Sequence, residues 1–159
     1  MVKHFELNSA AKYGDLSSLR YLIEEKKHPL KPRLLSVAAE RGHLDCVRYL
    51  LPLVEPSEIE EGLINAAASG KTRVVQFLVA YCTQVNTFNL SAFHACINNH
   101  DDAFWIVSPL CEVDNVHNRL KMARYEQGHP QSRLFYEAKF RETLLSETMG
   151  DRPTRVLKM

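Results

Sequence analysis

Two residue types in this 159-residue sequence could do chemistry, its four cysteines and seven histidines. Cysteine thiolates and histidine imidazoles are common zinc ligands, and a Cys–His pair can act as a nucleophile. No two cysteines have the Cys-x2–4-Cys spacing of a zinc site, so we expect no metal ion, no cofactor and no catalytic residue. A small thiol- or metal-dependent enzyme that uses Cys82 or Cys111 with a nearby histidine is kept as the alternative, because the sequence does not show which side chains meet.

The elements that position these residues come from an internal repeat. LNSAAKYGDLSSLRYLI (7–23), LSVAAERGHLDCVRYLL (35–51) and LINAAASGKTRVVQFLV (63–79) align without gaps, with Gly14, Gly42 and Gly70 each 28 residues apart. A fourth copy, AFHACINNHDDAFWIVS (92–108), has Asn99 in place of the glycine. Asparagine tolerates left-handed backbone better than other non-glycine residues, so we expect a turn with positive φ at all four positions.

Each copy predicts a helix–turn–helix unit. The first helix ends in small residues such as Ala38 and Ala39, and the second carries apolar residues at helical spacing. One such pair cannot bury its own apolar face, so stacking on the next pair must form the core. We expect Cys46 and Cys96 in that core, and Cys82 and Cys111, which follow second helices, to be partly exposed.

The run AAERGHLDCVRYLL resembles the central signature of the ankyrin repeat, and the resemblance covers residues 7 to about 108 in four copies. It implies an all-α helical repeat solenoid. We assign four repeats to residues 1–118, a degenerate fifth repeat or helical C-terminal cap to 119–150, and a mobile tail to 151–159. The resemblance also gives His43 a structural role, bracing adjacent turns through hydrogen bonds.

The repeats are shorter than the family's usual length of about 33 residues. We therefore expect reduced or absent β-hairpin fingers between the repeats, with Pro29, Pro32, Pro52 and Pro56 in extended turns. Ser57 before Glu60 predicts a capping box at the start of the third repeat.

The resemblance implies a binding surface on the concave face, which the first helices line in this family. Carried over position by position, the predicted partner-binding residues are Lys12, Tyr13, Arg33, Val37, Glu40, Arg41, Asn65, Ser69, His94 and Asn98. Tyr13, Arg41 and His94 are the expected hot spots, with Arg33 at the rim. The leading hypothesis is thus a non-enzymatic module that binds a protein partner, and a self-assembling structural subunit is a further alternative.

Trp105 breaks the pattern of the second helices. Polar residues, Arg20, Arg48 and Gln76, hold its position in copies one to three. We expect an amphipathic helix within residues 132–149 to cover Trp105 and close the exposed end of the stack.

Composition limits the class of partner. The formal net charge of +1 favours neither nucleic acid nor membrane, and no apolar run approaches the ~20 residues of a membrane span. The first six residues lack the apolar core of a signal peptide. We expect a cytoplasmic monomer, located in the host cytosol if the protein is a secreted effector.

Overall fold

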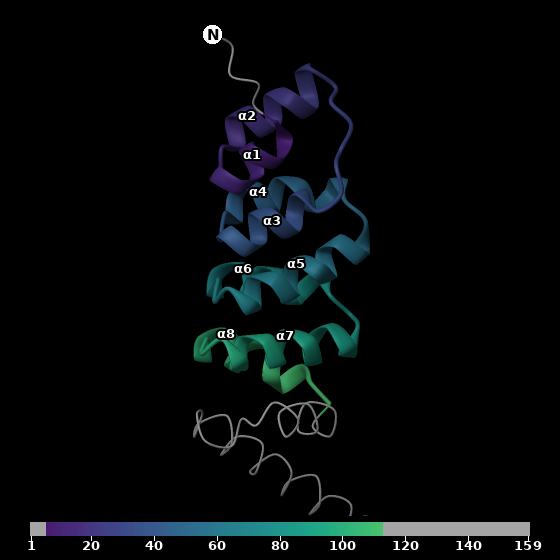
Figure 1. Ribbon diagram of the computed structural model, residues 1–159. Coiled ribbons are helices and arrows are strands. Elements are labelled where there is room, and N and C mark those ends of the chain that lie inside the picture. The colour runs from purple at the N-terminus through teal and green to yellow at the C-terminus, as the bar shows by residue number, and fades with distance from the viewer. Residues whose placement is uncertain (1–5, 113–159) are drawn as a thin grey trace, which may run out of the picture. The chain divides into compact units, whose positions relative to one another are not determined.

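The computed structural model describes residues 6–112, and the first five residues and residues 113–159 lie outside this part. By contacts the chain divides into two compact units, residues 1–112 and 113–159. The predicted fifth repeat, the helical cap and the tail therefore lie outside the described residues. The described unit is a stack of four helix pairs, which Figure 1 shows in order from purple to green.

The first helices of the four pairs form one layer of the stack and the second helices form the other. The first helices are α1 (Leu7–Tyr13), α3 (Leu34–Arg41), α5 (Pro56–Ala68) and α7 (Val85–Ile97). The second helices are α2 (Leu16–Arg20), α4 (Leu44–Leu50), α6 (Thr72–Leu78) and α8 (Asp101–Val107). Each second helix continues into a short turn of different pitch: a π-helix, η1 (Tyr21–Glu25), then the 3-10 helices η2 (Leu51–Leu53), η3 (Val79–Tyr81) and η4 (Ser108–Leu110). The all-α repeat fold predicted from the sequence is confirmed.

Small side chains let the first helices approach one another closely. The paired positions Ala10 and Ala11, Ala38 and Ala39, Ala66 and Ala67, and Ala95 and Cys96 are all buried. A Cβ atom at Gly62, in the middle of α5, would overlap the side chain of Leu35 on α3. The first-helix layer is therefore held at a spacing that larger side chains would not permit.

The apolar residues predicted at helical spacing in the second helices fill the space between the layers. Leu19, Val47, Val75 and Phe104 occupy equivalent positions in the four repeats, and all four are fully buried. Because Cys46 and Cys96 are also buried, their predicted core positions are confirmed.

The turn between the two helices of each pair has the predicted left-handed backbone. Gly14, Gly42 and Gly70 have φ of 74°, 85° and 65°, and Asn99 has φ of 62°. At each position the chain closes the first helix with a hydrogen bond back to its last turn, such as His43 N–H to the Ala38 carbonyl at 2.9 Å. The substitution of asparagine for glycine in the fourth repeat preserves this conformation.

The residue after each turn has a different role in the first repeat than in the others. Asp15 accepts hydrogen bonds from Ser18 N–H (2.9 Å) and Ser18 Oγ (2.6 Å), and these bonds lower the pKa of its carboxyl group. The equivalent His43 instead packs against Gly14 of the preceding repeat and donates from Nε2 to the Lys12 carbonyl at 2.9 Å. The predicted bracing role of His43 is thus confirmed.

The connections contain no β-strand within residues 6–112. Two of the four predicted extended turns are wrong: Pro52 lies in η2, and Pro56 is the first residue of α5, a position where its missing N–H costs nothing. The capping box is also wrong, because α5 begins before Ser57 and its N-cap residue, Glu55, makes no side-chain cap hydrogen bond. Residues that were expected to connect the second repeat to the third, and the third to the fourth, instead form the first turns of α5 and α7. Each of these helices is therefore 13 residues long.

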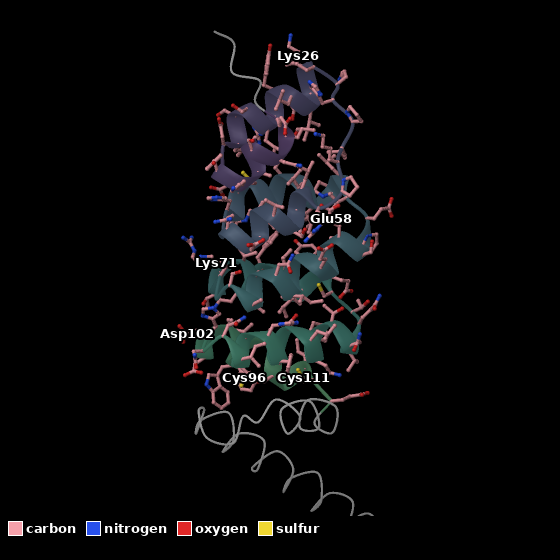
Figure 2. The ribbon with its side chains drawn as sticks, viewed as in Figure 1. Lys26, Glu58, Lys71, Cys96, Asp102 and Cys111 are labelled. Atoms are coloured by element: carbon pink, nitrogen blue, oxygen red, sulfur yellow. The ribbon has the colours of Figure 1, made fainter. Side chains whose placement is uncertain are left out.

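Side chains on these two long helices bind backbone N–H groups of neighbouring segments. Figure 2 labels Glu58, which lies on α5. Its Oε1 accepts a hydrogen bond from Leu35 N–H in the first turn of α3 at 2.7 Å. Glu60 Oε1 accepts from Thr83 N–H at 3.3 Å, and the buried Asn89 Oδ1 accepts from Glu112 N–H at 3.0 Å. Carboxylate and amide groups therefore join the helix starts to the neighbouring backbone.

We expect Asn99→Ala to lower the free energy of unfolding by about 1 kcal/mol. The left-handed backbone conformation costs about that much for a residue that has a Cβ atom and no polar side chain to form a local hydrogen bond. Asn99→Gly should be as stable as the wild type or slightly more stable. Urea unfolding of the full chain followed by circular dichroism measures both values. An alanine variant as stable as the glycine variant would contradict the role assigned to this turn.

Glu58→Ala should lower the free energy of unfolding by about 1 kcal/mol, since it leaves the Leu35 N–H of α3 without its capping acceptor. Glu58→Gln keeps an acceptor oxygen and should retain most of the stability. Glu40→Ala removes an exposed carboxylate from α3 and is the matched control, expected to stay within about 0.5 kcal/mol of the wild type in the same assay.

Candidate partner-binding surface

Nine of the ten predicted binding residues lie on the first helices or at their C-terminal caps. They fall in three rows of equivalent positions along the stack: Val37, Asn65 and His94; Lys12 and Glu40; and Tyr13, Arg41, Ser69 and Asn98. We call these nine residues the first-helix face. Lys12, Tyr13, Glu40, Arg41 and Asn98 are exposed, and the other four are half-buried. The stacked repeats thus bring these nine residues onto one surface.

Some side chains of the first-helix face already serve the stack. Asn98 Nδ2 donates to the Ala68 carbonyl of the preceding repeat at 2.8 Å. The Lys12 ammonium lies 5.7 Å from the ring centroid of Tyr13, whose side chain is 70% exposed. Within residues 6–112 neither the Tyr13 hydroxyl nor the Arg41 guanidinium forms a hydrogen bond or ion pair. These two side chains therefore have unused polar atoms and large contact area.

Arg33 lies apart from the other nine residues. It is the N-cap residue of α3, at the opposite end of that helix from Arg41, with a left-handed backbone of φ 71°. Its Nε donates to Glu61 Oε1 at 3.0 Å, in an ion pair whose side chains are 67% and 41% exposed. An exposed ion pair of this kind contributes little to the free energy of unfolding. Its main effect is to orient the Arg33 side chain.

The cysteines offer little to the thiol-enzyme alternative in the described part of the chain. The predicted partial exposure of Cys82 is wrong: this side chain is only 6% exposed, and its Sγ lies 3.9 Å from the Ile59 carbonyl. Burial, with smaller contributions from Glu60, raises the pKa of Cys82 to about 12. Cys111 is half-buried, as predicted. Among residues 6–112 there is no group of three His, Cys, Asp or Glu side chains that could hold a metal ion.

The sequence analysis missed a second surface, on the outer side of the second helices. The Arg20 guanidinium carbon lies 5.3 Å from the ring centroid of Tyr49, and that of Arg48 lies 5.4 Å from the centroid of Phe77. Each arginine therefore stacks on the aromatic residue of the next repeat. The signal was present: Arg20 and Arg48 are one repeat apart, and an aromatic residue follows each of them.

Trp105 is 40% exposed, and its ring meets Phe104 edge to face at a centroid distance of 5.6 Å. The helix expected to cover it belongs to residues 132–149, outside the described part, so this cover stays a prediction. No helix of the described residues has the length and apolar character needed to cross a membrane.

Cys82 should resist alkylation. With a pKa of about 12, only roughly one thiol in ten thousand is ionised at pH 8, and only the thiolate attacks. Iodoacetamide treatment of the folded protein at pH 8, followed by peptide mass spectrometry, should leave Cys82 unmodified while the same treatment in urea modifies it. Rapid labelling of Cys82 in the folded protein would restore the thiol-enzyme alternative.

Comparison with known proteins agrees with the repeat architecture. A family model of ankyrin repeats, in three copies, matches residues 35–119, which is more than half of the chain. An ankyrin repeat protein of Acanthamoeba polyphaga mimivirus is 26% identical over 115 residues, which are 70% of this chain and 18% of that protein. This chain thus spans less than a fifth of the relative it matches, and no solved structure matches it. The chain belongs to the ankyrin repeat family.

Proposed function

We propose that this protein is a non-enzymatic interaction module that binds a partner protein through its first-helix face. Ankyrin repeats are in general protein–protein interaction modules. The observation that carries the proposal is the row of exposed residues at equivalent positions of adjacent first helices, above all Tyr13 and Arg41. Tyrosine and arginine are enriched among residues that dominate binding energy, because both combine a large contact area with directional donors.

The contacts within the first-helix face support different roles for its residues. Tyr13 and Arg41 expose polar atoms that the stack does not use, whereas the Asn98 amide is engaged with Ala68. His94 is half-buried and meets Phe93 edge to face at a centroid distance of 5.4 Å, which orients its ring. We therefore assign the largest contributions to Tyr13 and Arg41, a smaller one to His94, and a structural role to Asn98.

The proposal includes a monomer that works in the cytosol, or in a host cytosol if the protein is a secreted effector. In its support, Cys46 and Cys82 are buried thiols, which a reducing compartment preserves. The self-assembling subunit is the competing proposal, and light scattering of the full chain over a range of concentrations separates the two by mass.

Tyr13→Ala and Arg41→Ala should each weaken partner binding by about tenfold or more, a loss of about 1.4 kcal/mol. The partner is first identified by affinity capture with the full chain and mass spectrometry, and its Kd is then measured by titration calorimetry. Tyr81→Ala and Arg73→Ala are the matched controls, since both side chains are exposed but belong to the second-helix layer.

Thermal unfolding must show that all four variants fold. If the two control variants lose binding while Tyr13→Ala and Arg41→Ala keep it, the partner binds the other layer and the proposed surface is wrong.

A further inference from the structure

The outer side of the second helices carries a regular arrangement of cations and aromatic rings. We call it the Arg–aromatic ladder and define it by Arg20, Tyr21, Arg48, Tyr49 and Phe77. Arg20 stacks on Tyr49 and Arg48 on Phe77, and the Lys26 ammonium lies 5.5 Å from the centroid of the Tyr21 ring. The ladder spans three repeats, and Tyr21, Arg20 and Arg48 are all exposed.

The stacked arginines keep their donor edges available. A guanidinium group that lies flat on a ring presents its N–H groups around the edge, where they can hold a carboxylate in two parallel hydrogen bonds. Arg20 forms no ion pair within residues 6–112. Arg48 has only a long contact, 4.0 Å from Nη1 to Asp45 Oδ1, and its side chain is 58% exposed. The rings therefore orient both guanidinium groups without consuming their hydrogen bonds.

A shallow hollow beside the ladder places a second cation near Arg48. It is lined by Arg48, Arg73, His43 and Asp45, with Gly14 and Gly42 at its wall. The two glycines have no side chains to fill the hollow, and Arg73 is exposed on α6. A carboxylate bound to Arg48 there would have two cations, Arg48 and Arg73, in its surroundings, together with the Asp45 carboxylate.

We propose that the Arg–aromatic ladder binds an acidic extended segment of a partner protein, with one carboxylate held by Arg20 and a second by Arg48. Arg20 and Arg48 stand at equivalent positions of α2 and α4, which contact each other, and the axes of packed helices are in general about 8–10 Å apart. A segment in the polyproline II conformation has three residues per turn and rises about 3.1 Å per residue, so every third side chain lies on one side at a spacing of about 9 Å. Acidic residues three apart in such a segment thus have a spacing close to the distance between packed helix axes.

The charges around the ladder favour a sparsely acidic protein segment over a nucleic acid. Asp45 lies beside Arg48, and Glu24 accepts a hydrogen bond from the Tyr49 hydroxyl at 2.9 Å. A polynucleotide would bring a dense row of phosphates onto both of these carboxylates. A segment with only two carboxylates brings one negative charge to each arginine, and so meets less repulsion from Asp45 and Glu24 than a row of phosphates does.

The test uses a fluorescein-labelled peptide with the repeating unit Glu-Pro-Pro and two glutamates, and measures its Kd for the full chain by fluorescence anisotropy. A peptide with glutamine at both positions is the first control. We expect the glutamate peptide to bind at least about tenfold more tightly at low salt, and 0.5 M NaCl to remove most of the difference. A peptide whose two glutamates are two residues apart should bind more weakly than the peptide whose glutamates are three residues apart.

Two variants locate the binding on the ladder. In a variant with Arg20→Gln and Arg48→Gln, confirmed as folded by circular dichroism, binding should fall to the level of the glutamine peptide. Gln76→Arg adds a third arginine at the equivalent position of α6, although the residue equivalent to Phe77 in the fourth repeat is Ile106, which offers no ring. A peptide with three glutamates should bind this variant about three to five times more tightly than the wild type, a gain that misfolding cannot produce.

Equal affinity for the glutamate and glutamine peptides would overturn the proposal, as would unchanged binding in the folded double variant or no gain in Gln76→Arg. Tighter binding of a single-stranded oligonucleotide than of the peptide would overturn it in favour of nucleic acid. Tyr13→Ala and Arg41→Ala should leave the peptide Kd unchanged, so the result is independent of the first-helix face.

Discussion

The close approach of the first helices is the constraint on which the rest of the structure depends. The alanine pairs and Gly62 keep these helices near one another, and the larger residues Leu19, Val47, Val75 and Phe104 fill the space behind them. Because a single helix pair has no core of its own, this inter-repeat contact is both the source of stability and the reason that the surface has repeating positions. A larger residue at one alanine would shift every residue that lies beyond it along the stack.

The sequence predicted the parts of the fold that repeat. The helix pairs, the buried alanines and the left-handed turns follow from side-chain size, periodicity and backbone preference, and the same pattern recurs in each repeat. The bracing role of His43 follows from the resemblance to the ankyrin repeat. The connections were predicted poorly, because Pro56 can either break a chain or begin a helix, and only the packing of α5 on α3 decides. The burial of Cys82 was missed for a related reason: it depends on the long α5 helix, whose start the sequence placed too late.

The first-helix face could be predicted from the sequence more fully than the Arg–aromatic ladder. Rows on the first-helix face follow directly from the repeat register, so nine of the ten predicted residues lie on one surface. The stacking of Arg20 and Arg48 on rings of the following repeat depends on side-chain conformation and on the distance between second helices. The spacing of 28 residues suggested which side chains are equivalent, but it did not indicate that they touch.

Three hydrogen bonds between repeats run in the same direction along the chain. In each of them a side chain of a later repeat binds the backbone of the earlier one: His43 binds the Lys12 carbonyl, Glu58 binds Leu35 N–H, and Asn98 binds the Ala68 carbonyl. Glu60 and Asn89 bind instead the N–H groups of residues that follow them, Thr83 and Glu112. During synthesis on the ribosome, the backbone groups of Lys12, Leu35 and Ala68 must therefore wait for 23 to 31 further residues before their partners exist. The repeat synthesised last always lacks the hydrogen bonds that the next repeat supplies. Folding of the nascent chain therefore lags about one repeat behind its synthesis.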